Sequence, residues 1–359
     1  MNQQSPQEIK NSGVALVSFL TILLTGLNGL ITYIFLMSLS RVNYGRDPEI
    51  KHGLASGISR LGGVAIICSV IFGVIFNLYF FDILSINALI TQLDSIVCFS
   101  ILIGLIGLLE DLFRSFSSVI RLVMMLLLVF LSLLIMPELI PYELGIFNIN
   151  SLVFNPILIF LITLIMICGY INAGNIADGA NGLLASIYLV FFIILYSLDN
   201  SIFNFSILMS LIVFIIYNVS TGRIFLGDFG SYSLSALVAF KSLELYANHN
   251  ISVFFLASIL VYPSFEITRS LVVRFINKSS LMSPDNYHLH NYMYNFLLSF
   301  GFKKHITNSF TGLIIAVLTS GPPLLLFFSD IIFDWLCLFL IEISVLSIIY
   351  IYFTKKYSR

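Results

Sequence analysis

Apolar runs long enough to cross a membrane recur along the whole chain. A spanning helix needs about 20 mostly apolar residues, and 59% of the 359 residues are hydrophobic while only 10% are charged. The approximate runs are 15–38, 61–81, 93–109, 118–136, 155–171, 183–198, 202–217, 231–247, 252–273, 306–328 and 335–353. Soluble domains are about 25% charged, so a soluble fold is excluded. The sequence predicts one integral membrane domain over 1–359, an all-α transmembrane bundle of about eleven helices, with ten as the alternative.

Basic residues divide the connections between these runs into two sets. With eleven runs, the Lys and Arg of the connections all fall on one set, and the opposite set carries acids such as Asp82, Glu138 and Asp334. Because basic loops stay in the cytoplasm, the N-terminus is expected on the periplasmic side and the C-terminus in the cytoplasm. The outer connection 137–154 holds Pro, Gly and alternating apolar residues, which predicts a small periplasmic hairpin.

Carboxylates at a membrane edge are costly, and here they gather at the expected inner ends of the helices. Glu110 and Asp111 close the third run in GLIGLLEDLF. Two acids at a helix C-terminus oppose the helix dipole, so this pair is expected beside a cation or a transferable proton. A solvated helix end is the alternative.

A polar turn, NAGNIADGANG, follows the fifth run. Asn172, Asn175, Asp178 and Asn181 recur at three-residue spacing, which sets them on one face of the turn. Glycines such as Gly179 let the backbone approach a ligand, and the N–H groups of the next helix favour an anion. An ordinary helix cap and turn is the alternative.

Two further loops carry polar or aromatic side chains. GRIFLGDFGS places Asp228 next to Phe225, just before a helix. An aspartate there is also a common helix cap, and a phenylalanine is by default a core residue, although an exposed Phe225 would stack on a nucleobase. SPDNYHLHN holds Asp285, His288 and His290. The two histidines suit metal ligation, phosphate binding or proton transfer equally well.

A basic stretch, RDPEIKHGLASGISRLGG, contains Arg46, Lys51, His52 and Arg60. It is either plain inner-leaflet charge or a docking site for a lipid phosphate. All five clusters fall on the same side of the predicted bundle. Together they provide the groups that phosphoryl transfer needs. Acids can hold a cation, amides and aromatic side chains can bind a nucleobase and a sugar, and basic side chains can bind phosphate. Oxygen ligands favour Mg²⁺, with Mn²⁺ as a substitute.

Together these motifs resemble those of the polyprenyl-phosphate N-acetylhexosamine-1-phosphate transferases, a superfamily that includes the phospho-MurNAc-pentapeptide translocases. The resemblance is carried by GLLEDL with Arg121 following, NAGNIADGANGL, GRIFLGDFGS and SPDNYHLHN, and KHGLASGISRLGG is similar to the family's N-terminal basic motif. It implies a magnesium-dependent, multi-pass enzyme of the bacterial inner membrane with its active site facing the cytoplasm. Such an enzyme moves a sugar-1-phosphate from a UDP-N-acetylhexosamine to undecaprenyl phosphate and releases UMP. The resemblance also implies that the protein interacts with membrane lipid and not with nucleic acid, and it is compatible with a homodimer.

The resemblance also assigns roles to individual residues. Asp228 falls on the family's metal-binding acid, and Glu110 with Asp111 falls on an acidic pair implicated in binding the metal and the lipid phosphate. Asp178 with Asn175 matches an acid and an amide near the nucleotide-sugar. Phe225 and Asn218 match residues of the family's uracil pocket. His288 and His290 match the family's loop histidines. The other expected substrate contacts are Lys51, His52, Arg60, Asn172, Gly179 and Asn181.

Three positions depart from the family pattern. Glu110 replaces an aspartate and lengthens the side chain by one methylene, Asn181 replaces a second acid and cannot act as a base, and Asn291 replaces a third histidine. These departures point toward the branch that starts O-antigen or other surface glycans. Two alternatives are a lipid or solute transporter, which would place its charges near the middle of the membrane, and an inactive family member that acts as a scaffold.

The ninth run contains Tyr262, Pro263 and Glu266 within apolar sequence. A proline interrupts the helical hydrogen-bond ladder, which predicts a kink. Either the bent helix opens a groove for a prenyl chain, or the kink serves packing and Glu266 is hydrogen-bonded internally.

Overall fold

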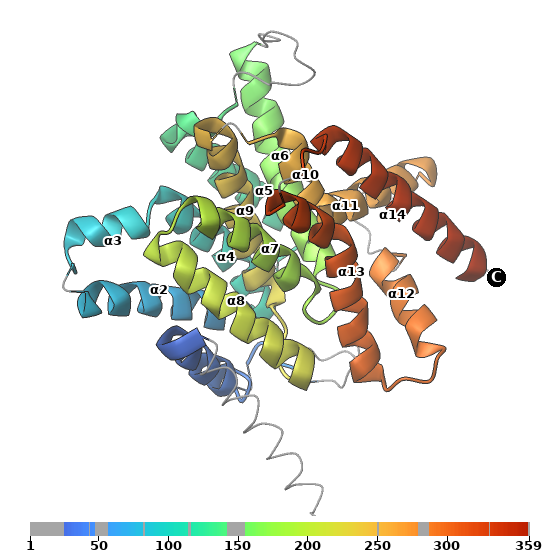
Figure 1. Cartoon of the computed structure of the whole chain (residues 1–359), viewed down its shortest axis with the longest axis horizontal. Helices are drawn as coiled ribbons and strands as arrows, with labels where there is room; N and C mark the ends of the chain where they lie inside the picture. Colours follow the sequence, from blue (N-terminus) through green and yellow to red (C-terminus); the bar gives the residue numbers. More distant parts are fainter. Residues whose placement is uncertain are drawn as a thin grey trace, which may run out of the picture.

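The computed structural model describes residues 25–42, 44–46, 57–81, 83–113, 116–141, 155–249, 251–278, 287–329 and 331–357. Within these ranges the fold is helical, with only isolated β-bridges and no strand (Figure 1). An apolar helix over Thr25–Leu39 comes first. The others are α2 (Gly62–Phe80), α3 (Ile86–Gln92), α4 (Ser95–Phe113), α5 (Ser118–Ile135), the 3₁₀ turn η1 (Pro137–Leu139), α6 (Pro156–Ala177), α7 (Leu183–Leu198), α8 (Ile202–Thr221), α9 (Gly227–His249), α10 (Val253–Ile259), α11 (Val261–Ile276), α12 (Leu289–Leu298), α13 (Lys304–Phe327) and α14 (Trp335–Tyr357).

The predicted all-α, polytopic membrane architecture is confirmed. Seven of the described helices are long and apolar enough to cross a membrane, or eight if the bent pair α10 and α11 is one span. Each of the eleven predicted runs overlaps a helix or this pair, but the helix over Thr25–Leu39 and α7 are shorter, and α9 is not among the seven spans. The count of eleven and the orientation therefore stay predictions. The predicted hairpin in 137–154 lies mostly outside the described residues.

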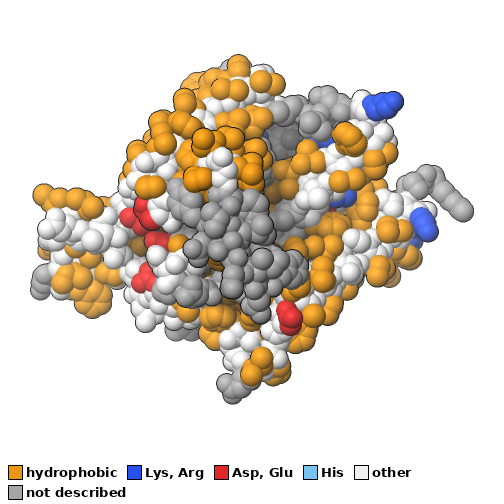
Figure 2. All heavy atoms as spheres, turned by 90° about the horizontal axis from the view of Figure 1, so that it is seen from above, with side chains coloured by type: hydrophobic (Ala, Val, Ile, Leu, Met, Phe, Trp, Pro, Cys, Tyr) orange, Lys and Arg blue, Asp and Glu red, His pale blue; other side chains and the backbone are white. Residues whose placement is uncertain are grey.

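The surface of the bundle is apolar, as a lipid environment requires. Many large hydrophobic side chains on α4, α5, α6, α13 and α14 are exposed. Figure 2 shows hydrophobic side chains spread over much of one face, with Lys, Arg, Asp and Glu in only a few places. In water this exposure would cost free energy, so these helices present their side chains to the bilayer.

The kink predicted in the ninth run is confirmed. α10 and α11 meet at an angle of 82°, and the break lies at Leu260. Pro263 is the third residue of α11, where its missing N–H removes no hydrogen bond from the new helix. The proline is therefore compatible with the start of α11 but not with a continuous helix through Leu260.

α4 and α9 form the centre of the bundle and run antiparallel. Asp111 near the end of α4 contacts the start of α9, while Asp94 before α4 pairs with Lys241 and lies at the other end. The two helices approach closely because Gly107 lies directly against the backbone of Asp228.

Candidate active site

Two buried aspartates meet where α4 ends and α9 begins. Arg60 joins them, with Nη1 at 3.0 Å from Asp111 Oδ1 and Nη2 at 2.9 Å from Asp228 Oδ1. Arg121 in the first turn of α5 reaches Asp228 Oδ2 at 3.3 Å. The side chains of Asp111 and Asp228 are 0% and 8% exposed. Two acids and two arginines thus form a nearly neutral, charge-paired cluster at one end of the bundle.

Asp111 also caps α9 from outside that helix. Its Oδ2 accepts the backbone N–H groups of Asp228 at 2.8 Å and Phe229 at 3.3 Å. The first N–H groups of a helix have no partner within it, and an anion there is favoured by the helix dipole. Gly227, the residue before Asp228, has a φ of +77°, and a side chain on it would overlap the Arg60 carbonyl. Asp111 and Gly227 together therefore fix the place of Asp228.

The loop before α9 is held against the start of α2. The N–H groups of Gly62 and Gly63 donate to the carbonyls of Phe225 and Leu226 at 2.9 and 2.8 Å. Arg60 immediately precedes this contact, which explains why its side chain lies between the two aspartates. Phe225 is half-buried in this loop.

The Asp178 turn borders the same cluster. Asp178 ends α6, and desolvation raises its pKa well above the usual aspartate value, while the Arg60 charge lowers it and the charges of Asp228 and Asp111 raise it. A side chain on Gly179 would overlap the imidazole of His290. Nε2 of His290 therefore lies against the backbone of this turn, and the turn connects the aspartates to the histidines.

The two predicted histidines lie at the start of α12 and are held by α11. His288 Nδ1 lies 2.9 Å from Glu266 Oε2, and His290 Nδ1 lies 2.9 Å from the hydroxyl of Tyr262. The imidazole rings stack with centroids 5.3 Å apart and an interplanar angle of 15°. Glu266 is also 3.3 Å from Nε of Arg269. The internal hydrogen bonding considered for Glu266 is confirmed.

Several predicted substrate contacts are engaged within the protein. Asn181 donates to Ser309 at 3.2 Å, and its own N–H donates to Asn308 at 3.1 Å, so this amide ties the turn to α13. Asn218 donates to the carbonyl of Ile224 at 2.7 Å and stabilises the loop before α9.

Asn172 donates to the carbonyl of Cys168 one helical turn earlier. Asn175 is half-buried on the same helix, and its side chain interacts with that of Tyr232. Lys51, His52 and Asp285 lie outside the described residues.

Sequence reasoning gave no role to Arg269 and Tyr350. Arg269 Nη1 donates to the Tyr350 hydroxyl at 3.1 Å, and the guanidinium lies over the Tyr350 ring, 5.1 Å from its centroid. The sequence does contain a signal for Arg269, which lies one helical turn after the intramembrane Glu266. A charge within the membrane needs a partner, so a glutamate and an arginine at this spacing are expected to pair.

Asp111 and Asp228 fit a magnesium ion. Among the described residues no group of three His, Cys, Asp or Glu side chains is close enough to hold a metal. Mg²⁺ instead takes one or two carboxylates and completes its shell with water and substrate phosphates. Asp111 Oδ2 is engaged by backbone N–H groups, and the other three carboxylate oxygens contact Arg60 or Arg121. An ion would take these three oxygens only in exchange for the arginines.

Glu110 accepts the backbone N–H of Phe116 at 3.3 Å. We expect Glu110→Asp to stay active, because the charge is retained, and to lose about 1 kcal/mol of stability as this bond lengthens. Turnover and thermal melting of the purified variant check this. Complete loss of turnover would mean that the site is built around the longer side chain.

Charged groups brought together where α4 ends and α9 begins, within an apolar helix bundle, define a polytopic membrane protein with a charged site at one end of the bundle. The sequence profile of glycosyl transferase family 4 matches residues 93–246, which include Asp111, Asp178 and Asp228. The chain is 27% identical over 257 residues to a probable undecaprenyl-phosphate N-acetylglucosaminyl 1-phosphate transferase of Bacillus subtilis, covering 67% of this chain and 66% of that protein.

Two further relatives match shorter stretches. An undecaprenyl-phosphate alpha-N-acetylglucosaminyl 1-phosphate transferase of Thermotoga maritima is 30% identical over 54% of this chain and 59% of its own length. A phospho-N-acetylmuramoyl-pentapeptide-transferase of Fervidobacterium nodosum is 29% identical over 31% of this chain and 37% of its own length. The chain thus matches between about a third and two thirds of these curated relatives. These findings confirm the predicted resemblance to the polyprenyl-phosphate hexosamine-1-phosphate transferase superfamily.

Proposed function

We propose that this protein transfers an N-acetylhexosamine-1-phosphate from a UDP-sugar to undecaprenyl phosphate and releases UMP, as the first step of a lipid-linked surface glycan such as O-antigen. The observation that carries the proposal is the cluster of Asp111, Asp228, Arg60 and Arg121 next to the Asp178 turn. Two polyanions must meet in this reaction, and the cluster supplies both the positive groups for phosphate and the acids for a cation.

The chemistry requires attack by a lipid phosphate oxygen on the sugar-bearing phosphorus, with UMP as the leaving group. The second pKa of a phosphate monoester is about 6, so the nucleophile is ionised at neutral pH without a strong base. Preorganised charges are then the main contribution of the protein. Arg60 and Arg121 would bind phosphate oxygens. His290, which lies against Gly179 of the Asp178 turn, and His288, which stacks on it, would share the remaining charge.

The charge balance predicts when a cation binds. Asp111 and Asp228 are already paired with Arg60 and Arg121, so a divalent ion alone would leave net positive charge at the site. When the diphosphate enters, the arginines can turn to phosphate oxygens and free carboxylate oxygens for Mg²⁺. Bound there, the ion would neutralise the diphosphate and favour UMP as leaving group. We therefore expect Mg²⁺ to bind together with the nucleotide-sugar.

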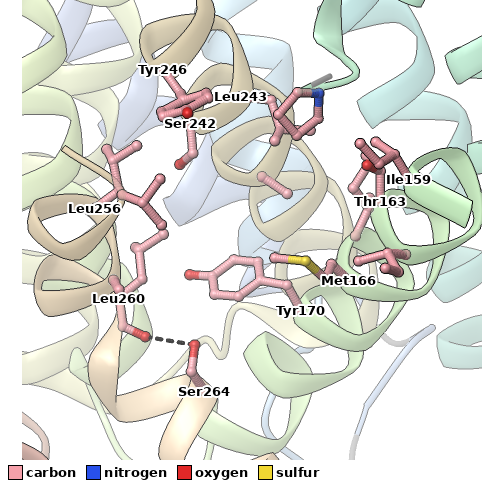
Figure 3. Close-up of a pocket in the computed structure, with 16 residues that line it drawn as sticks. Ile159, Thr163, Met166, Tyr170, Ser242, Leu243, Tyr246, Leu256, Leu260 and Ser264 are labelled. Carbon is pink, nitrogen blue, oxygen red and sulfur yellow. Dashed lines mark hydrogen bonds between the residues drawn. The ribbon is translucent and has the colours of Figure 1, made fainter. Parts of the chain in front are cut away.

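The lipid chain needs an apolar path to this site. A pocket of about 280 Å³ lies between α6, α9, α10 and α11, and its walls are almost entirely apolar. Figure 3 shows Tyr170 and Met166 on one wall and Leu256 and Leu260 on the other, with the bond from Ser264 to the Leu260 carbonyl at the helix break. In the proposed orientation the charged cluster faces the cytoplasm of a bacterium, and this pocket accommodates part of the prenyl chain.

An assay of UMP release tests the proposal. Purified protein in detergent is expected to release UMP from a UDP-N-acetylhexosamine only when undecaprenyl phosphate and Mg²⁺ are both present. EDTA should abolish release, and excess Mg²⁺, or Mn²⁺ less effectively, should restore it. Screening several UDP-sugars identifies the donor. Movement of lipid or solute across vesicles without UMP release would favour a transporter, and no activity with any donor would favour an inactive scaffold.

A further inference from the structure

Glu266 is a fully buried carboxylate in α11, about one turn after Pro263. Such a group is costly in a membrane helix unless it is paired and hydrogen-bonded. Arg269 on the same helix face provides the balancing charge at 3.3 Å. Two further partners of Glu266, His288 and Leu289, belong to the start of α12, which carries the two histidines.

Glu266 caps α12 from a different helix. Its Oε1 accepts the N–H of Leu289 at 2.7 Å, and its Oε2 lies 2.9 Å from Nδ1 of His288. The residue at the N-cap of α12, His288, makes no side-chain cap of its own. This arrangement repeats the one between Asp111 and α9: a buried carboxylate, paired with an arginine, holds the start of a helix that carries site residues.

The contact with Glu266 favours a proton on Nδ1 of His288. An ionised carboxylate only accepts hydrogen bonds, so a hydrogen bond between Oε2 and Nδ1 needs a proton on Nδ1. Arg269 Nη2 lies 2.9 Å from the same nitrogen and also donates to the Ser270 hydroxyl at 2.8 Å. Because a guanidinium nitrogen only donates, this contact favours an unprotonated Nδ1, and Glu266 and Arg269 compete for this nitrogen. With Nδ1 engaged, Nε2 is the nitrogen left for a ligand.

The direction of Nε2 follows from the stacked pair of rings. His288 and His290 both place Nδ1 against α11, through Glu266 and Tyr262. The rings are nearly parallel, and His290 meets Gly179 of the Asp178 turn on the side away from α11. Nε2 of His288 therefore faces the same side as this turn.

We infer that Glu266 is a positioning residue for His288: it holds the proton on Nδ1 and so presents Nε2 to the phosphate groups of the substrate. The inference rests on the proposed function for the identity of that substrate. Since Glu266 and Arg269 balance each other, a second proton on Nε2 gives His288 a positive charge directed at the diphosphate. No covalent bond to His288 forms or breaks.

The substitution Glu266→Gln separates positioning from packing. The amide oxygen of Gln can still accept the Leu289 N–H, while its NH₂ group donates to Nδ1 and reverses the histidine tautomer. We expect kcat for UMP release to fall at least ~10-fold, the scale of a misplaced acid–base group. In a His288→Gln background the same substitution should cost little more, because it acts through that ring. Additive losses would overturn the inference.

A spectroscopic measurement does not depend on turnover. The chain has five histidines, and the ¹⁵N signals of His288 are identified by their absence in His288→Gln. At a pH where the imidazole is neutral, the wild-type protein should show the proton on Nδ1 and Glu266→Gln should show it on Nε2. The same tautomer in both proteins would overturn the inference. The expected tautomers without any UMP release would instead refute the proposed function and leave the positioning intact.

Two variants control for folding. Glu342 in α14 is also buried and belongs to neither arginine–carboxylate pair, so Glu342→Gln should keep wild-type turnover. Glu266→Asp retains an acceptor and should keep the Nδ1 proton with part of the activity. If Glu266→Gln does not fold, this aspartate variant carries the test, and a tautomer switch in it would overturn the inference.

Discussion

Asp228→Asn is expected to lower the rate of UMP release at least ~100-fold, the loss typical of removing one preorganised electrostatic partner. The side chain keeps its size, and the start of α9 keeps its cap, because Asp111 bonds to the backbone N–H of residue 228 and not to its side chain. The charge lost is the one that both Arg60 and Arg121 contact. The substitution also removes the proposed ligand for Mg²⁺ and the negative charge that holds both arginines in place.

Asp94→Asn is the matched control. Asp94 lies at the opposite end of the same helix pair, where it pairs with Lys241 and caps α4 through the N–H of Val97. An asparagine still accepts that bond, so turnover should be unchanged. Both variants are compared by UMP release and by thermal melting. Near-normal turnover in Asp228→Asn, with a folded protein, would refute the assignment of a metal to this residue.

The meeting of Asp111, Asp178 and Asp228 was predictable because topology restricts where helix ends lie. Each acid ends or begins an apolar run, and alternating the runs across the membrane places all three on one side. No contact information is needed for that step. The pairing with Arg60 was not predictable, since the basic stretch before α2 reads equally well as inner-leaflet charge, and the bridge arises from the backbone contact of Gly62 with Phe225.

The amides show where periodicity stops being informative. Asn172, Asn175, Asp178 and Asn181 were placed on one face by their spacing, but α6 ends at Ala177. Beyond that point the chain turns, and Asn181 is buried against α13. A spacing rule holds only within one regular element, and a helix packed from far along the chain then decides which polar groups remain available. The same limit applies to Glu266, whose partners in α12 are separated from it by a connection.

Gly107→Ala is expected to reduce both stability and activity, because it acts on the contact that brings the aspartates together. A methyl group there would overlap the backbone carbonyl of Asp228, which cannot rotate away as a side chain can. α4 and α9 must separate, and overpacking of this kind costs about 1–3 kcal/mol. Asp111 then withdraws from the N–H groups of α9, so Asp228 loses its fixed position and turnover falls with the melting temperature.

Gly169→Ala distinguishes this effect from a general response of membrane helices to the loss of glycine. Gly169 lies in α6, and a methyl group on it would meet no atom within 4 Å. Alanine favours a helix over glycine by about 1 kcal/mol, so this variant should melt at the same or a higher temperature and keep its activity. If Gly107→Ala behaves like Gly169→Ala, α4 and α9 are not in backbone contact, and the Asp111–Asp228 pair described for this site is then wrong.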